Sequence, residues 1–269
     1  MTRFAVGVEY DGGGFSGWQT QVDLNTVQAE MEKALSQVLA HPVGVTGAGR
    51  TDTGVHSRGQ VVHFNTDAQR SERSLVLGTN TLLPSSIAVR WARAVPDHFH
   101  ARYSALARTY RYCILNRQAR PALGAGRVAF IHRPLRLEPM IEAGQMLVGT
   151  HDFSSFRAAE CQAKSAVREL RDLRLQRHGE FVLLEITANA FLHHMVRNIA
   201  GLLIHIGMGE ALPALATELL LARNRRQAPA TAPAAGLYLW RVHYPSVFGL
   251  PDDSDIMVPA AGCPADLMV

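Results

Sequence analysis

The order of strands and helices predicted by the hydrophobic pattern occurs twice along this chain, and it constrains the fold more than any other feature. Alternating apolar residues indicate strands, and apolar residues recurring every three or four positions indicate helices. The first half gives, in order, a strand over 4–9, a helix capped by Asn25 with Gln28 in the capping-box position, strands over 43–46 and 60–65, a helix over 72–82 capped by Ser71, and a strand over 87–92. This order is the β-α-β-β-α-β ferredoxin-like unit.

The second half repeats this order of elements, without convincing identity between the residues of the two halves. Its predicted elements are a strand over 108–115, a helix over 138–148, a hairpin of strands 168–177 and 181–188, helices over 191–208 and 213–223, and a strand over 237–243. We therefore predict an α+β protein of two ferredoxin-like halves, residues 1–104 and 105–245. Their antiparallel sheets are expected to lie side by side, with an active-site cleft between them. Residues 246–269 lack a clear period and predict a loosely ordered tail.

The cationic residues of the chain are almost all arginine. Lys33 and Lys164 are the only lysines among 27 lysine and arginine residues, and the formal net charge is +4 over 269 residues. Arginine offers a planar fork that pairs with phosphate and stacks on bases. This composition favours a nucleic-acid partner, with a codon bias toward arginine as the alternative.

The remaining composition excludes several classes of protein. Cys113, Cys161 and Cys263 are odd in number and widely separated, so neither a disulfide framework nor a zinc-cysteine site is indicated. The N-terminus lacks a signal-peptide pattern, and no apolar run is long enough to span a bilayer. We expect a cytoplasmic protein without a membrane segment.

The twelve histidines do not form a pattern typical of a metal site. The only close groups are His98 with His100 and His193 with His194, and neither has a carboxylate or cysteine at ligand spacing. We predict no bound metal.

The segment from Gly47 to Arg58 is the richest candidate for chemistry. Asp52 lies between Arg50 and Arg58 in a loop punctuated by glycines. Two guanidinium groups folded close to a carboxyl group would keep it ionised, and glycine lets the backbone approach a ligand. The pattern indicates a nucleophile or base that acts on an anionic polymer. The alternative is an Asx-turn with solvated arginines.

A strand that interleaves basic and aromatic residues is the second candidate. Arg108, Tyr110 and Tyr112 share one face by strand alternation. An exposed ring on a sheet can stack on an RNA base, which contributes about 1–3 kcal/mol. The alternative is that these tyrosines fill the core.

Arg197 is the third candidate, because it lies on a helix that is mostly apolar. Its neighbours on that face include Ala200 and Ile204, so the face is not a solvated surface. An arginine there needs a carboxylate or phosphate partner. Asp52 is the obvious carboxylate, and a structural Arg–Glu pair is the alternative.

The turn from Gly12 to Gly17 matches the G-x-G-x-x-G pattern of dinucleotide sites. That fingerprint requires a helix beginning at the loop, and here seven residues intervene before the predicted Asn25 cap. A loop that packs against the protein or faces RNA is the better interpretation.

Taken together, these segments resemble the bacterial tRNA pseudouridine synthase family that acts on the anticodon stem-loop (the TruA family). The similarity extends from about residue 3 to 245 and leaves only the tail outside. The matching segments are Tyr10-Asp-Gly, Phe15-Ser-Gly-Trp-Gln19, Gly49-Arg-Thr-Asp-Thr-Gly-Val-His56, Phe99-His-Ala-Arg102, Arg108-Thr-Tyr-Arg-Tyr112, His151-Asp-Phe-Ser-Ser-Phe156, Phe191-Leu-His-His-Met-Val-Arg-Asn-Ile199, Ala228-Pro and Gly236-Leu-Tyr238.

The resemblance implies isomerisation of uridine to pseudouridine at tRNA positions 38, 39 and 40, by a homodimer without cofactor or metal. It implies that Asp52 is the catalytic aspartate, that Tyr110 stacks on the target base, and that Arg197 pairs with the catalytic aspartate. It also implies substrate contacts from Arg50, Arg58 and Leu237. Whether Asp52 attacks C1′, adds to C6 or removes a ribose proton stays open, and His194 receives no role.

Two other classes of function remain at this stage. A non-catalytic RNA-binding module would use the same aromatic strand and would not require Asp52. A nucleotide-dependent enzyme would use the Gly12–Gly17 turn, and the absence of a helix starting there counts against it.

Overall fold

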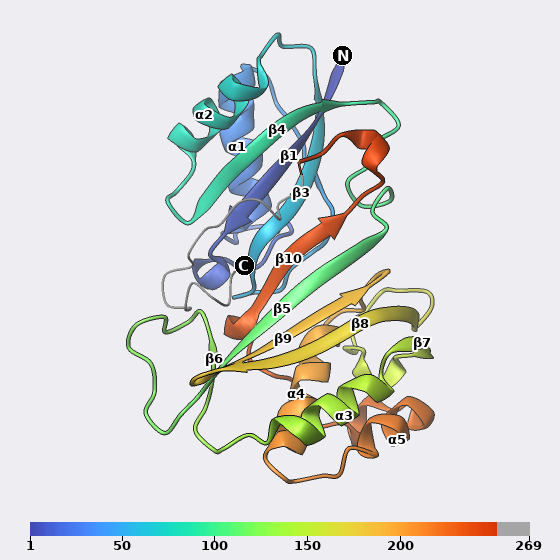
Figure 1. The fold of residues 1–269 in the computed structure, drawn as a ribbon. Coiled ribbons are helices and arrows are strands. Elements are labelled where there is room, and N and C mark those ends of the chain that lie inside the picture. Colours follow the sequence, from blue (N-terminus) through green and yellow to red (C-terminus); the bar gives the residue numbers. More distant parts are fainter. Residues whose placement is uncertain (252–269) are drawn as a thin grey trace. The chain divides into compact units, whose positions relative to one another are not determined.

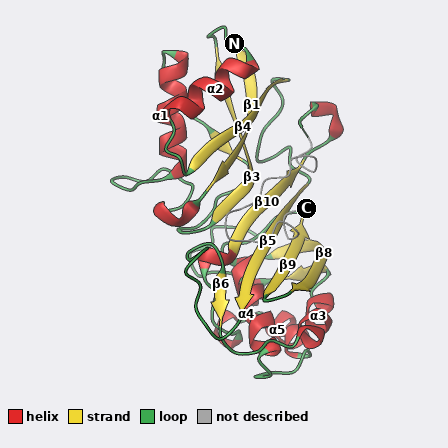
Figure 2. Cartoon of the chain, turned by 60° about the vertical axis from the view of Figure 1, so that its left-hand side comes forward, coloured by secondary structure: helices red, strands yellow, loops and turns green. Residues whose placement is uncertain are grey.

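The computed structural model describes residues 1–251, which divide into two units. Unit 1 contains Met1–Leu106 and the segment that begins at Tyr238, and unit 2 contains Ala107–Leu237 (Figure 1). Each unit combines helices with a largely antiparallel sheet (Figure 2), so the predicted α+β class is confirmed. No helix within these 251 residues is both long enough and apolar enough to cross a membrane.

Unit 1 contains the predicted ferredoxin-like arrangement. Its elements are β1 (Thr2–Tyr10), α1 (Val27–Leu39), β2 (Thr46–Gly47), β3 (His56–Thr66), α2 (Glu72–Leu82), β4 (Ile87–Val95) and β10 (Leu237–His243). The strands β4, β1, β3 and β2 lie in that order and pair antiparallel. Helix α2 begins as predicted at Ser71, whose hydroxyl accepts the Ser74 N–H at 3.1 Å.

The last strand groups with unit 1 except for its first residue, Leu237, whereas the sequence placed it in the second half. β10 pairs parallel with β3, with Tyr238 opposite His56 and Leu239 opposite Ser57. The Ser57 hydroxyl also donates to the Leu239 carbonyl at 3.1 Å. These contacts join a strand to elements about 180 positions earlier, which local sequence patterns do not reveal.

The start of α1 differs by one residue from the sequence prediction. Thr26, not Asn25, is the N-cap residue, and its side chain makes no capping hydrogen bond. The Asn25 amide donates to the Gly14 carbonyl at 3.3 Å, and the Gln28 amide donates to Glu32 at 2.9 Å. The capping-box prediction was therefore wrong, because Asn25 bonds to the Gly12–Gly17 turn and Gln28 bonds to Glu32 within α1.

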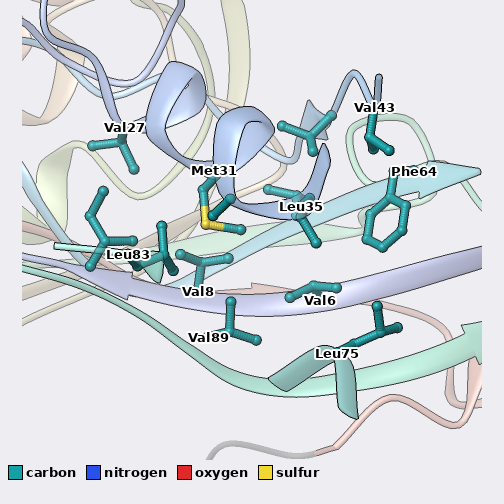
Figure 3. Packing of buried hydrophobic residues seen from close by; sticks show 14 of the residues in the cluster. Val6, Val8, Val27, Met31, Leu35, Val43, Phe64, Leu75, Leu83 and Val89 are labelled. Atoms are coloured by element: carbon teal, nitrogen blue, oxygen red, sulfur yellow. The ribbon is translucent and has the colours of Figure 1, made fainter. Parts of the chain in front are cut away.

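The core of unit 1 lies between its sheet and its two helices. Helix α1 contributes Met31 and Leu35, and α2 contributes Leu75, to the same cluster as Val6 and Phe64 of the sheet (Figure 3). Burying each such side chain contributes about 1.5–3 kcal/mol. This packing fixes the sheet whose strand ends carry the Asp52 loop.

Unit 2 contains the predicted helices and hairpin, with two short strands that the sequence did not indicate. Its elements are β5 (Ala107–Asn116), β6 (Ala129–Ile131), α3 (Leu137–Met146), β7 (Gly149–Asp152), β8 (Val167–His178), β9 (Phe181–Ala188), α4 (Met195–Gly207) and α5 (Leu215–Ala222). The strands β5, β9, β8 and β7 follow each other antiparallel, and β6 pairs parallel with β5.

Helix α4 begins four residues later than the apolar pattern predicted. His194 has a left-handed backbone with φ of 61°, which a helix interior does not accept. The His193 carbonyl accepts the Ala158 N–H at 3.0 Å instead of taking part in a helix. Residues 191–194 therefore form a turn that leads into α4.

The predicted tail begins with an ordered turn. Ser246–Phe248 form a short 3-10 helix, and the Phe248 ring contacts the Phe99 ring with centroids 5.0 Å apart. Residues 252–269 of the predicted tail lie outside the described residues.

Candidate active site

Asp52 lies in the loop that joins β2 to β3 in unit 1. Its side chain is half-buried, while Thr51 before it and Val55 after it are buried. The Val55 N–H donates to the Asp52 carbonyl at 3.1 Å, and Gly54 between them has a positive φ of 76°. The turn thus buries two flanking side chains and leaves the carboxylate partly accessible.

The Gly12–Gly17 turn supports this loop from the side. A Cβ atom on Gly12 would stand 1.9 Å from the Val55 carbonyl oxygen, and one on Gly17 would stand 2.7 Å from the Thr51 carbonyl oxygen. Gly17 also has a positive φ of 89°, which favours glycine. The next residue, Trp18, donates its backbone N–H to the Thr51 carbonyl at 3.0 Å.

No helix of the dinucleotide-binding kind begins at this turn. Gly12–Gly14 form a single 3-10 turn, and α1 starts only at Val27. Gly12 and Gly17 allow close contact with the Asp52 loop, which supports the packing interpretation of the turn.

Three polar contacts that the sequence did not indicate fix the loop at its ends. The Tyr10 hydroxyl lies 2.8 Å from the Thr51 hydroxyl oxygen. The buried His56 ring places Nδ1 3.1 Å from the Gly12 nitrogen and 3.0 Å from an Asp11 carboxylate oxygen. Tyr10, Asp11 and Gly12 are consecutive and form one of the matching segments. That segment was the sequence signal for these contacts.

The two predicted RNA-contacting arginines of unit 1 differ in their surroundings. Arg50 is exposed at the start of the loop. Arg58 lies on β3 with its guanidinium carbon 4.5 Å from the centre of the Trp240 ring, a cation–π contact. The Arg58 carbonyl accepts a hydrogen bond from Arg90 at 3.2 Å. The position of Arg58 is therefore set by β10.

The aromatic strand β5 of unit 2 buries both of its tyrosines. Tyr112 is fully buried, and its hydroxyl donates to the Pro233 carbonyl at 2.8 Å. Burial raises the pKa of the Tyr112 hydroxyl, and the charge of Arg197 acts in the opposite direction. Tyr110 is 8% exposed and contacts the Phe191 ring edge-on, with centroids 4.9 Å apart. Both tyrosines are buried, as the alternative for this strand stated, and the stacking role of Tyr110 stays a prediction.

Arg197 is bound to the segment 228–233 from two sides. Its Nε donates to the Ala232 carbonyl at 2.9 Å, and the Ala232 N–H donates to the Arg197 carbonyl at 3.1 Å. Gly201, one turn further along α4, lets the chain approach closely, because a Cβ there would stand 2.1 Å from the Ala230 carbonyl oxygen. The segment therefore orients the guanidinium group of Arg197 through its Nε atom.

The segment 228–233 is itself held by hydrogen bonds among Arg225, Asn198 and Thr231. Arg225 donates to the carbonyls of Ala228 at 3.0 Å and Pro229 at 2.9 Å. The other end of its guanidinium donates to Asn198 at 3.1 Å and Thr231 at 3.0 Å. The Thr231 hydroxyl also donates to Asn198 at 2.7 Å. Burial lowers the pKa of Arg225, so these acceptors replace solvent around the guanidinium.

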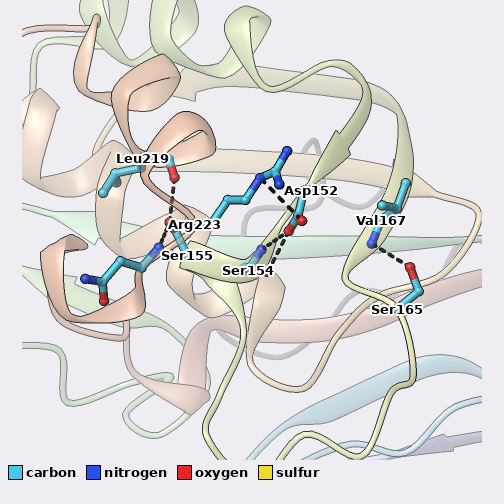
Figure 4. Close-up of polar contacts among 8 residues, drawn as sticks. Asp152, Ser154, Ser155, Ser165, Val167, Leu219 and Arg223 are labelled. Carbon is cyan, nitrogen blue, oxygen red and sulfur yellow. Dashed lines mark hydrogen bonds and ion pairs between the residues drawn. The ribbon is translucent and has the colours of Figure 1, made fainter.

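The segment His151–Phe156 anchors the chain just before Arg225 (Figure 4). The Ser155 hydroxyl donates to the Leu219 carbonyl at 2.5 Å and accepts the Asn224 N–H at 2.8 Å. Asp152 accepts hydrogen bonds from the hydroxyl and the N–H of Ser154 at 2.6 and 2.9 Å. The hydroxyl bond from Ser154 is the main cause of the lowered pKa of Asp152, and Arg223, 3.5 Å away, adds to it.

The six predicted site residues fall into two groups of three. Asp52, Arg50 and Arg58 belong to one loop and the following strand of unit 1, and Tyr110, Arg197 and Leu237 belong to unit 2. Leu237 is buried at the start of β10. The sequence missed Asn198, Arg225 and Thr231, although Asn198 stands next to Arg197 in one of the matching segments.

Comparison with known proteins identifies the same family as the sequence motifs. The model of a family described as tRNA pseudouridine synthase matches residues 7–104 and 143–245. Proteins named tRNA pseudouridine synthase A from Methylococcus capsulatus and Pseudomonas aeruginosa are each 54% identical to this chain. The first match covers 94% of this chain and 93% of the relative, and the second covers 94% and 89%.

A third relative with the same name, from Nitrosococcus oceani, is 55% identical over 93% of this chain and 96% of its own length. Both the N-terminal match, which contains Asp52, and the C-terminal match, which contains Arg197, lie inside the family model. This chain belongs to the tRNA pseudouridine synthase family, the isomerases that convert uridine to pseudouridine in tRNA.

Proposed function

We propose that this chain isomerises uridine to pseudouridine at positions 38, 39 and 40 in the anticodon stem-loop of tRNA, with Asp52 as the nucleophile or base. The observation that carries the proposal is a half-buried carboxylate on a loop fixed by close backbone contacts. A group held in this way is preorganised for reaction, because little reordering is needed when substrate binds.

The proposed reaction requires one carboxylate and a held base. The bond from C1′ to N1 breaks, the uracil turns, and a bond from C1′ to C5 forms. The proton on C5 leaves to solvent and N1 regains a proton, so substrate and product are isomers. No electrons are transferred, and the reaction needs no redox carrier.

The proposal assigns supporting roles to two residues of unit 2. Tyr110 holds the uracil by stacking, and Arg197 stabilises the ionised form of Asp52. Support for the Arg197 role comes from its fixed position on α4, where Ala232 binds both its Nε and its carbonyl. Support for the Tyr110 role comes from the resemblance and not from exposure, because Tyr110 is only 8% exposed.

Three further residues are proposed to contact the substrate. Arg50 is exposed and Arg58 is preoriented on the Trp240 ring, which suits both for phosphate contacts. Leu237 is proposed to pack against the target nucleotide at the start of β10.

The deciding experiment measures release of tritium from unmodified tRNA that carries 5-tritiated uridine. Wild type should release tritium, and Asp52→Asn should lose about 10⁴-fold or more in rate, because an amide cannot act as nucleophile or base. Asp23→Asn is the matched control: Asp23 is exposed and has a left-handed backbone with φ of 59°, which asparagine tolerates.

Two results would reject the proposal in different ways. If wild type bound tRNA without releasing tritium, the chain would be an RNA-binding module. If Asp52→Asn kept a tenth of wild-type activity, another residue would be the reacting group.

We also propose that the enzyme is a cytoplasmic homodimer that works without a metal or cofactor. Sedimentation at micromolar concentration tests the oligomeric state. Activity that persists after dialysis against a chelator tests independence from metal.

A further inference from the structure

The loop from His98 to Leu106 in unit 1 exposes an aromatic ring that the proposed reaction does not use. The Tyr103 side chain is 75% exposed, whereas Phe99 and Ala101 in the same loop are completely buried. Arg102 beside it is also exposed. The loop thus anchors itself in the protein and presents Tyr103 and Arg102 to solvent, together with His98 and Leu106 at its two ends.

Hydrogen bonds within the loop fix the backbone that carries Tyr103. The Nδ1 atom of His100 accepts the N–H groups of Arg102 at 3.1 Å and Tyr103 at 3.2 Å. The Ser104 N–H donates to the His100 carbonyl at 2.9 Å, and the Ser104 hydroxyl accepts the His100 N–H at 3.0 Å. These four bonds close a tight turn around His100.

Three contacts attach this turn to the rest of unit 1. The Ala101 N–H donates to Nδ1 of the buried His63 at 3.2 Å. The Tyr244 hydroxyl donates to the Ala101 carbonyl at 2.6 Å, and Arg3 donates to the Phe99 carbonyl at 2.8 Å. A ring presented on such a turn loses little conformational freedom when it binds a partner.

The exposed ring adjoins another aromatic ring and a cationic group. The Tyr103 ring contacts the His100 ring at a tilt, with centroids 4.3 Å apart and an angle of 33° between the planes. The guanidinium carbon of Arg102 is 5.6 Å from the centre of the Tyr103 ring. Flat rings with an adjacent arginine are the side chains that bind unpaired RNA bases, by stacking and by phosphate contact.

The loop lies at the opposite end of the unit 1 sheet from Asp52. It follows Val95 at the end of β4 that pairs with Arg3, whereas Ile87 at the other end pairs with Tyr10, beside the Asp52 loop. His63, which binds the loop, is seven residues along β3 from His56. At about 3.3 Å per residue, that separation is roughly 20 Å. A nucleotide at Tyr103 is therefore not the reacting nucleotide.

We infer that the His98–Leu106 loop is a second RNA contact, at which Tyr103 stacks on an unpaired base of the tRNA and Arg102 contacts the adjacent phosphate. The inference rests on the proposed function, because it takes the same tRNA as the bound molecule. It adds a contact that contributes to affinity and not to the chemical step.

The test compares tRNA affinity with the single-turnover rate at saturating enzyme. Tyr103→Ala should weaken tRNA binding at least about fivefold, the lower end of what loss of one base stack causes. Tyr103→Phe should bind within about twofold of wild type, because it keeps the ring. Arg102→Gln should lower the slope of log affinity against log salt by about one unit. All three variants should keep the wild-type single-turnover rate.

Two surface variants on α2 serve as matched controls. Leu77 is 55% exposed and Arg73 is exposed, so Leu77→Ala and Arg73→Gln remove an exposed apolar group and an exposed charge outside the loop. Neither should change tRNA affinity or its salt dependence. A loss of affinity in these controls equal to that in the loop variants would overturn the inference, since the effect would then not belong to the loop.

Other outcomes also overturn the inference while leaving the proposed function intact. Tyr103→Ala with wild-type affinity would show that no base stacks there. A lowered melting temperature of Tyr103→Ala that accounts for the weaker binding would show a structural ring. A changed sedimentation coefficient with unchanged tRNA affinity would assign the ring to a protein contact. Failure of wild type to release tritium would instead reject the proposed function.

Discussion

The Asp52 loop of unit 1 and the segment 228–233 of unit 2 each hold a proposed catalytic residue, and they do so by different means. The Asp52 loop is fixed mainly by backbone that approaches to contact distance where Gly12 and Gly17 lack a side chain. The segment 228–233 also touches one glycine, Gly201, but it is fixed mainly by hydrogen bonds from Arg225, with Asn198 and Thr231.

This difference determines which substitutions each region tolerates. A backbone contact has no flexible part, so any added atom must displace the loop. A side-chain network can lose one bond and retain others, but it then leaves a buried polar group without a partner. The first region should therefore be sensitive to added volume, and the second to lost hydrogen bonds.

Gly12→Ala should give the largest effect, about 3 kcal/mol of destabilisation together with a loss of activity. The new Cβ would lie 1.9 Å from the Val55 carbonyl oxygen and 2.6 Å from its carbon, both backbone atoms. Overpacking of this kind costs about 1–3 kcal/mol or more. Urea unfolding followed by circular dichroism measures the stability, and tritium release measures the activity.

Gly14→Ala is the control in the same 3-10 turn. A Cβ on Gly14 meets nothing within 4 Å, so this variant should unfold within about 0.5 kcal/mol of wild type. Equal destabilisation by both variants would mean that the turn rejects alanine for its backbone conformation and that contact with Val55 is not the cause.

Arg225→Met should destabilise by about 2–3 kcal/mol and lower the catalytic rate more than the affinity for tRNA. The substitution removes hydrogen bonds to the carbonyls of Ala228 and Pro229 and to Asn198, which are then poorly satisfied. Arg197 would lose the orientation that Ala232 provides. Single-turnover rates and tRNA affinity separate the two effects.

Arg226→Met tests whether the network, and not a charge, causes this loss. Arg226 is adjacent to Arg225 but exposed, so its replacement should change stability by no more than about 0.5 kcal/mol. Arg225→Lys should recover only part of the stability, because an ammonium group cannot reproduce the guanidinium fork. If both methionine variants behaved alike, the network would not orient Arg197.

The sequence predicts the long periodic elements of the fold and misses two of the short strands, whereas the strand predicted over 43–46 is present only as the two-residue β2. Helix α2 and the β8–β9 hairpin lie close to where their patterns indicated, because apolar spacing persists over eight or more residues. β6 and β7 contain three and four residues, too few for a period to show. The start of α4 was misplaced because His194 adopts a left-handed conformation in an otherwise apolar stretch.

The candidate site likewise has one part that the sequence indicates and one part that it does not. Asp52, Arg50 and Arg58 of the first region stand with several glycines in one continuous string, so the local sequence indicates a site there. The supporting glycines, Gly12 and Gly17, lie outside that string. The network of the second region joins Arg225 to Asn198 across 27 positions. No local pattern specifies a contact of that range, since it depends on how α4 packs against the chain that follows it.

Unit 1 and the segment 228–233 should also differ in their response to acid, an effect of about 2 kcal/mol. The Asn198, Thr231 and Arg225 side chains do not titrate between pH 4 and 6.5, whereas unit 1 buries His63. Burial, followed by the charges of His100 and Arg3, lowers the pKa of His63 from 6.5 to about 4, and a bond to the Thr46 backbone opposes this.

The direction of this effect follows from proton binding. Between pH 6.5 and 4 the unfolded chain binds a proton at His63 and the folded chain does not, so stability falls as the pH is lowered through this range and then levels off. His63→Asn, whose side-chain oxygen can still accept the Ala101 N–H, should remove this part of the pH dependence. A His63 imidazole resonance that titrates near pH 6.5 in the folded protein would contradict the prediction.

Tyr112→Phe should give the smallest effect, about 1 kcal/mol, and it tests whether the second region depends on individual hydrogen bonds. The Tyr112 hydroxyl donates to the Pro233 carbonyl at 2.8 Å, one residue beyond Ala232, and the ring itself is fully buried. Phenylalanine keeps the packing and removes that bond, which contributes about 0.5–1.5 kcal/mol. Urea unfolding should detect the loss, while Tyr103→Phe in the exposed loop of unit 1 should unfold like wild type. If Tyr112→Phe were also neutral, packing would hold the segment near Pro233, and the contrast between the two regions would rest on Arg225 alone.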